Sequence, residues 1–143
     1  MRYLTYKKIS DKLIKETVKK NNDKNTGSLI IFKGLVRKDF IDKKVFVKEI
    51  FYESYKKMAE KKIEEIVEDA MKKFDVKEII VKHRIGRVKP GEVAFLVIVL
   101  SSHRKEGFLA IQFVIDEIKS KVPIWKKEIL SNNKYRWKEE KYV

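Results

Sequence analysis

Hydrophobic and polar residues follow two clear patterns along this chain. Between residues 56 and 74, apolar side chains recur every three or four positions among lysines and glutamates, which is typical of an amphipathic helix. Residues 93–100 are apolar at nearly every position, as in a strand that is covered on both faces. The pattern therefore predicts one long surface helix and one strand at the centre of the core.

Shorter signals predict the remaining elements. We expect a helix over residues 11–20 with Ser10 as its N-cap, and a second long helix over residues 105–121 that Pro123 terminates. Residues 89–91 form a predicted turn. The other predicted strands cover residues 28–36, 45–52, 77–83 and 135–137. The order β-α-β-β-α-β-β-α-β predicts an α+β fold, with helices packed on a mixed, largely antiparallel sheet.

Length and composition narrow the class of protein. The chain has 143 residues, so we expect residues 1–143 to form a single domain. There is no cysteine, which excludes disulfides, thiolate metal sites and cysteine nucleophiles. The two histidines, His83 and His103, are too few for a histidine-rich metal site, so we expect no metal and no cofactor. The apolar runs are too short to span a bilayer and no secretory signal is evident, so we expect a cytoplasmic protein with no membrane partner.

The charge balance points to an anionic partner. Lysine and arginine number 35 against 21 acidic residues, which gives a net charge of +14. Either nucleic acid or a small anionic substrate would explain this surplus. Solvated lysines on helix faces are the simpler explanation for many of these charges.

Two His-Arg pairs are candidate chemical groups. His103 and Arg104 lie between the most apolar strand and a helix, where backbone N–H groups and the helix dipole favour anions. Arg104 adds a planar cation suited to phosphate or carboxylate, and His103 adds a titrating group. The alternative is a surface pair that closes a strand. His83 and Arg84 precede a turn, and for His83 we favour a structural role.

A further cationic stretch surrounds Pro123 and Trp125. Lys119 and Lys121 suit the end of a helix, where the dipole favours cations. Trp125 beside lysines is either ordinary packing or the wall of a pocket. Arg37 lies where a predicted strand runs into a basic loop.

Several of these segments match the motifs of one known family. The motifs are GxVR at 34–37, HRIGxxxPGE at 83–92, SSHR at 101–104, IDxIKxxxPIWKKE at 115–128 and RW at 136–137. Together they resemble the large, catalytic subunit of molybdopterin synthase over about residues 28–137. HRIG alone is a weak signal, whereas SSHR followed by IDxIKxxxPIWKKE is specific.

The resemblance implies an α/β-hammerhead type of fold and a sulfurtransferase of molybdenum cofactor biosynthesis. In this family, cyclic pyranopterin monophosphate becomes molybdopterin, a dithiolene. The sulfur arrives as a thiocarboxylate on the C-terminal Gly-Gly tail of a small ubiquitin-like subunit. The implied assembly is a heterotetramer, in which two large subunits form a central homodimer and one small subunit docks at each outer end.

The resemblance also assigns roles to single residues. Lys119 and Lys126 are the implied catalytic pair, where the thiocarboxylate meets the substrate, and our hypothesis gives Lys119 the main role. All the residues implied to contact the substrate or line its pocket are polar and most are basic: Arg37, His103, Arg104, Lys119, Lys126, Lys127 and Glu128.

The residues themselves support this chemistry in one respect. A sulfur-inserting enzyme without cysteine cannot carry a persulfide, so the sulfur must arrive activated on another molecule. A pocket of cationic side chains can then stabilise the negative charges of substrate, donor and oxyanion. The alternative is a basic nucleic-acid-binding module, although the chain has no RRM-type aromatic signature and no KH-type GxxG loop.

Overall fold

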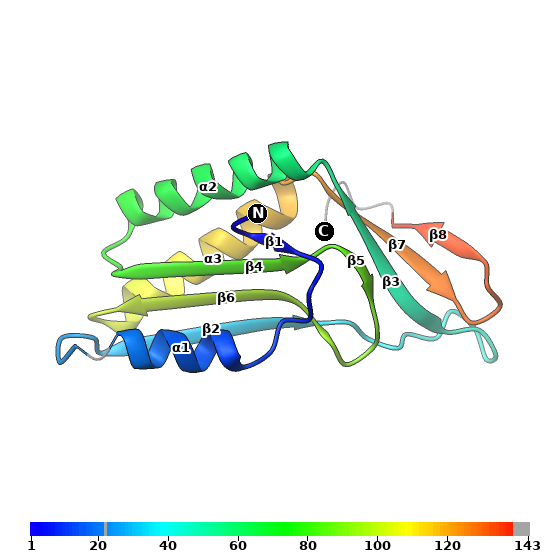
Figure 1. Cartoon of the computed structure of the whole chain (residues 1–143), viewed down its shortest axis with the longest axis horizontal. Coiled ribbons are helices and arrows are strands. Elements are labelled where there is room, and N and C mark those ends of the chain that lie inside the picture. Colours follow the sequence, from blue (N-terminus) through cyan, green and yellow to red (C-terminus); the bar gives the residue numbers. More distant parts are fainter. Residues whose placement is uncertain (22, 139–143) are drawn as a thin grey trace.

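The computed structural model describes residues 1–21 and 23–138 and contains two four-stranded sheets (Figure 1). The main sheet has the order β1-β4-β6-β2, with Leu4–Thr5 (β1), Glu78–Arg84 (β4), Val93–Ser101 (β6) and Ser28–Leu35 (β2). The second sheet has the order β5-β3-β7-β8, with Gly86–Val88 (β5), Val47–Ser54 (β3), Ile124–Leu130 (β7) and Tyr135–Trp137 (β8). The helices are Lys12–Lys20 (α1), Lys56–Lys73 (α2) and Arg104–Lys121 (α3).

The pairing directions confirm the expected α+β class. β1 runs parallel to β4, and the other strand pairs are antiparallel, so the main sheet is mixed and mostly antiparallel. Figure 1 shows the second sheet beyond one end of the main sheet, with the two connected through β3, β5 and β7. This arrangement agrees with the hammerhead type of fold implied by the motifs.

Strand β6 is buried on both faces, as its sequence predicts. Phe95, Val97 and Val99 belong to the cluster that includes α2 and α3 residues, whereas Leu96 and Ile98 face a second cluster that includes residues of α1. Burying one such side chain contributes about 2 kcal/mol, so the strand anchors both layers. Helix α2 likewise starts at the predicted residue and buries the centre of the predicted stripe, from Ala59 to Ala70, whereas Met58 and Met71 of that stripe are exposed.

Strand β7 is the longest element that sequence reasoning missed, and the short strand β5 was missed as well. We expected this segment to be a cationic stretch after a turn at Pro123, but it pairs with β3 on one side and β8 on the other. Ile124, Glu128 and Leu130 are its buried residues. A buried carboxylate and adjacent lysines interrupt the apolar alternation that identifies a strand, which is why the pattern was hidden.

The start of α1 corrects a second expectation. Asp11, and not Ser10, occupies the N-cap position, and its side chain makes no capping hydrogen bond. The Ser10 hydroxyl oxygen instead accepts a bond from the backbone N–H of Lys12 at 3.3 Å. The helix is held by Leu13 and Ile14, which pack under β6, so tertiary packing outweighs the cap.

Two features are absent from residues 1–21 and 23–138. No helix there has the length and hydrophobicity needed to cross a membrane. Nor does that part of the chain bring three or more histidine, aspartate or glutamate side chains together in a way that could hold a metal ion.

Candidate active site

Helix α3 carries two predicted site regions at its opposite ends. His103 is the N-cap of α3 and Arg104 its first residue, whereas Lys119 lies in its last turn. At 1.5 Å of rise per residue, the backbones of Arg104 and Lys119 are about 22 Å apart. A single chain therefore does not bring His103 and Arg104 together with Lys119.

The backbone at the start of α3 is tightly packed. The Ser101 hydroxyl donates to the His103 carbonyl oxygen at 2.7 Å, and the Gly27 N–H donates to the Ser101 carbonyl oxygen at 3.0 Å. A Cβ atom at Gly27 would lie 2.2 Å from the Ser102 carbonyl oxygen, so only glycine fits. The side chains of His103 and Arg104 are exposed on this rigid corner. An exposed guanidinium and imidazole at the N-terminus of a helix can bind an anion.

At the other end of α3, residues from several elements converge. Tyr52 of β3 lies directly opposite Lys126 of β7, so their side chains share one face of the second sheet. The Tyr52 ring also contacts the ring of His83 from β4, with centroids 5.1 Å apart. Burial lowers the pKa of His83 to about 4, and the positive charge of Lys119 adds to this effect. Lys119 and Lys126 therefore gather around the same histidine-tyrosine pair.

Arg37 lies at the Lys119 end of the main sheet. β2 is antiparallel to β6, with Leu35 opposite Val93 at the start of β6, whereas α3 begins beyond the end of β6 and runs back along it (Figure 1). Arg37 follows β2 directly and is exposed, with Nη2 at 3.3 Å from Oδ2 of Asp39. The chain thus places Arg37 with the lysines and away from His103.

The remaining predicted residues lie next to one another on β7 but point to opposite faces. Lys126 and Glu128 face the same side, whereas Lys127 stacks on the other side, with Nζ 5.1 Å from the Phe51 centroid and 5.2 Å from that of Trp137. The Glu128 side chain is only 3% exposed, and one oxygen lies 2.5 Å from Nε of Arg136. Lys127 therefore contacts aromatic rings, and Glu128 ties β8 to β7.

His83 and Arg84 place buried nitrogen atoms behind the lysines. His83 is completely buried and Arg84 is 6% exposed. Nη2 of Arg84 donates to the Arg87 carbonyl oxygen at 2.8 Å, and neither Nε nor Nη1 has a hydrogen-bond partner among the described residues. Sequence reasoning gave His83 a structural role, and its complete burial agrees with that interpretation. The motif gave no sign that a ring nitrogen would be left without a partner among the described residues.

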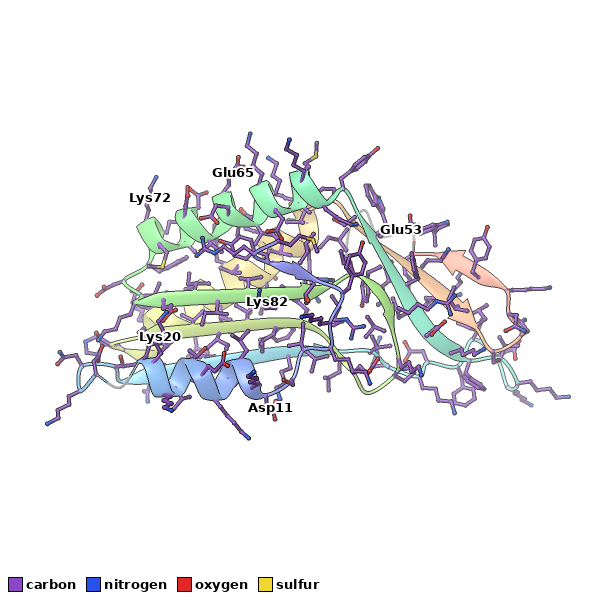
Figure 2. All side chains as sticks on the ribbon, viewed as in Figure 1. Asp11, Lys20, Glu53, Glu65, Lys72 and Lys82 are labelled. Atoms are coloured by element: carbon purple, nitrogen blue, oxygen red, sulfur yellow. The ribbon has the colours of Figure 1, made fainter. Side chains whose placement is uncertain are left out.

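An aromatic cleft of about 650 Å³ opens beside β3 and β7. Glu53, labelled in Figure 2, lies on its wall near the start of α2. Sequence reasoning had raised Trp125 as a possible pocket wall but did not anticipate the other rings, because they come from separate parts of the chain. The aromatic side chains of the lining are Tyr6, Phe51, Tyr52, Tyr55, Trp125 and Trp137.

Comparison with known proteins identifies the family. A model of the MoaE protein family matches residues 4–121. The chain belongs to this family. The molybdopterin synthase catalytic subunit of Pyrococcus abyssi is 34% identical, over 96% of this chain and 91% of its own length. The protein of the same name from Thermoplasma volcanium is 37% identical, over 93% of this chain and 97% of its own length.

Solved structures agree with this assignment. Molybdopterin synthase from Staphylococcus aureus superposes with a TM-score of 0.82 and is 31% identical, with 95% of each chain covered. The complex of subunits 1 and 2 of molybdopterin-converting factor from Helicobacter pylori has the same fold, with a TM-score of 0.81 at 22% identity over 98% of this chain and 91% of that one. The expected family and enzyme class are therefore confirmed: this MoaE chain is an enzyme subunit of molybdenum cofactor biosynthesis.

Proposed function

We propose that this chain transfers sulfur from a thiocarboxylate to cyclic pyranopterin monophosphate and so forms the dithiolene of molybdopterin. The observation that carries the proposal is the convergence of Lys119 and Lys126 on the Tyr52–His83 pair, where the two sheets meet. Cations at this point suit a reaction in which donor, substrate and tetrahedral intermediate are all negative. The lack of cysteine fits a donor that brings its sulfur from outside the chain.

The donor is a small ubiquitin-like subunit, and we place its C-terminal Gly-Gly tail in the aromatic cleft. The cleft holds about 650 Å³ and is lined in part by Tyr52, which lies directly opposite Lys126. Glycines have no side chains, so an extended tail can pass between rings without a clash. The Helicobacter pylori relative forms a complex of two different subunits, which agrees with such a partner.

A second copy of the chain completes the site in this proposal. His103 and Arg104 lie about 22 Å of helix away from Lys119, so phosphate binding by Arg104 near Lys119 needs another subunit. β2 is an edge strand of the main sheet, and Leu29, Ile31 and Leu35 are exposed along it. Exposed apolar residues on an unpaired edge favour association.

Antiparallel pairing of β2 with its copy would give the required geometry. A two-fold axis through the strand brings the end of one β2 beside the start of the other. Ser28 at the start of β2 lies opposite Ser101, just before His103, whereas Arg37 follows the end of β2. Arg37 of one copy would therefore approach His103 and Arg104 of the other. This arrangement is a homodimer, and we propose that it is the centre of a cytoplasmic heterotetramer with one small subunit at each outer end.

The charges of the chain do not favour the alternative of a nucleic-acid-binding module. Lysines on the helices have acidic neighbours, as in the pairs Lys62–Glu65 and Lys121–Glu117. Many of the surplus charges therefore belong to solvated helix faces. Polynucleotide binding would show a steep loss of affinity with salt, whereas a pocket for one small substrate would show a shallow one.

The test is reconstitution with the thiocarboxylated small subunit and cyclic pyranopterin monophosphate, followed by detection of the dithiolene. Lys119→Ala should lower turnover about a hundredfold, because a lost charge-stabilising contact costs about 3 kcal/mol. Lys121→Ala is the matched control, since that ammonium already pairs with Glu117 at 2.8 Å. Normal turnover by Lys119→Ala would refute the role of Lys119, and no dithiolene from the unaltered chain would refute the function.

A further inference from the structure

The side chains of strand β8 are all exposed. Tyr135, Arg136 and Trp137 form this strand, which lies at the end of the second sheet next to β7. A strand of three exposed residues buries little apolar surface, so the hydrophobic effect contributes little to its position. Contacts of another kind must therefore hold β8 against β7.

Two neighbouring charges of β7 provide these contacts from opposite faces of the sheet. On one face the buried Glu128 carboxylate pairs with Arg136, with Oε1 2.5 Å from Nε. On the other face Lys127 lies directly opposite Trp137, and its Nζ is 5.2 Å from the Trp137 ring centroid. The same Nζ is 4.9 Å from the centroid of Tyr135. Both exposed rings of β8 therefore contact one ammonium group.

A third ring, from β3, completes the surroundings of this ammonium. Phe51 lies opposite Lys127 in the register of β3 with β7, and its centroid is 5.1 Å from Nζ. All three distances are within the range of cation–π attraction. Each contact is weak at a surface, but one cation that is shared by three rings fixes the rings of β3 and β8 relative to each other.

Two of the three rings are also walls of the aromatic cleft. Phe51 and Trp137 line it, together with the Tyr55–Trp125 pair, whose centroids are 5.6 Å apart. Lys127 is not among the described residues of the lining. Its charge therefore acts on the cleft through the rings that it contacts.

We propose that Lys127 is a positioning residue, whose ammonium keeps Trp137 in the wall of the cleft and thereby sets the affinity for the Gly-Gly tail of the small subunit. The proposal rests on the proposed function, which places that tail in the cleft. It differs from the role implied by the motifs, in which Lys127 lines the substrate pocket. The charge of Lys127 acts on binding of the partner and not on the transfer of sulfur.

Neutral and charged replacements separate the charge of Lys127 from its bulk. Lys127→Met retains a stem of similar length without the charge, whereas Lys127→Arg retains a cation that stacks on rings. In titrations with the small subunit, we expect Lys127→Met to bind about tenfold more weakly and Lys127→Arg to stay within about threefold of the unaltered chain. In the reconstituted assay, Lys127→Met should raise KM for the small subunit more than it lowers kcat.

Lys73→Met is the matched control for this substitution. Nζ of Lys73 lies 4.8 Å from the centroid of Phe113, at the end of α2, and neither residue lines the cleft. The variant therefore loses a similar cation–π contact elsewhere and should bind the small subunit normally. Equal affinities of Lys127→Met and the unaltered chain, or equal losses in Lys127→Met and Lys127→Arg, would overturn the proposal.

A small subunit without its last two glycines shows whether the effect depends on the cleft. Lys127→Met and the unaltered chain should have the same affinity for this shortened subunit, because no tail then enters the cleft. A tenfold difference that persists with the shortened subunit would mean that Lys127 contacts the body of the partner, and it would refute the proposed role.

Proton NMR of the full chain alone tests the contacts of Lys127 without partner or turnover. Ring currents should move its Cε protons upfield of those of solvent-exposed lysines, and Trp137→Leu should reverse part of this shift. If these protons resonate with those of exposed lysines, the ammonium does not lie over the rings and the proposal fails. Confirmed ring contacts without dithiolene formation by the unaltered chain would instead count against the proposed function.

Discussion

The two ends of α3 carry exposed polar side chains in different surroundings. At its start, His103 and Arg104 project into solvent from a backbone that is fixed by Gly27 and by Ser101. At its end, Lys119 is exposed as well, but a buried wall of rings that includes His83 and Tyr52 lies close enough for its charge to act on the imidazole. The first end suits contact with an anion from solvent, whereas the second places a cation beside a buried, less polar wall, where electrostatic interactions are stronger.

This difference indicates a division of labour between the ends. Under the proposed function neither end is a complete site, because the proposed phosphate-binding groups are at one end and the lysines are at the other, about 22 Å away along the helix. A helix of 18 residues cannot bend enough to bring its own ends together. The fold of a single chain therefore carries two half-sites, and pairing of two chains is the simplest way to join them.

The largest expected effect comes from separating the half-sites onto different chains. Arg104→Ala and Lys119→Ala should each lower dithiolene formation about a hundredfold when assayed alone. After subunit exchange in an equal mixture, about half of the dimers are mixed and each has one intact site out of two, so about a quarter of the activity should return. The measurement is turnover before and after exchange, with the small subunit and substrate in excess.

The control for this experiment is a mixture of Lys119→Ala with a Lys119→Ala, Arg104→Ala double variant, which offers no intact site in any dimer. Activity should stay at the background level there. If the informative mixture also stays at background, Arg104 and Lys119 do not act together across two chains, and the two ends of α3 have separate functions.

The sequence predicted the elements whose burial follows a simple period. The α2 stripe and the apolar run of β6 are such cases, because one or both faces contact the core continuously. β7 was missed because Lys126, Lys127 and Glu128 replace apolar residues at the centre of a strand. Local propensity does not predict a strand where charged groups occupy its positions, and β7 at the candidate site is such a strand.

The site could be predicted as a set of residue types but not as a geometry. The motifs gave Lys119, Lys126 and Arg104, and helix length alone could have shown that Arg104 and Lys119 lie far apart. The contact of Tyr52 with His83 and its register with Lys126 depend on pairing between distant strands. No periodicity in the sequence encodes such a long-range register.

The buried wall at the end of α3 predicts a specific pH dependence of stability. His83 has a folded pKa of about 4 against 6.5 for the ordinary side chain. As the pH falls from 7 to 4, the unfolded chain binds a proton that the folded chain excludes, so the free energy of unfolding should fall by about 3 kcal/mol. His83→Gln removes this contribution, and urea unfolding of both chains at pH 7 and pH 4 measures it. An equal fall in both chains would mean that His83 is not held neutral.

The smallest expected effect is a difference in stability between two glycine substitutions, one near the start of α3 and one near Arg37. Gly27→Ala places a Cβ 2.2 Å from the Ser102 carbonyl oxygen, and such overpacking costs about 2 kcal/mol. Gly91, in the turn beside β2 and the Arg37 end, has a φ of +86° but open space around it, so Gly91→Ala should cost only about 1 kcal/mol. Urea unfolding measures the loss of stability in each variant.

Inorganic phosphate binding should weaken in Gly27→Ala, because the added Cβ pushes Ser102 away and so displaces the His103 backbone, and it should persist in Gly91→Ala. Equal costs, or phosphate binding unchanged in Gly27→Ala, would show that the corner at the start of α3 is not the rigid support described above.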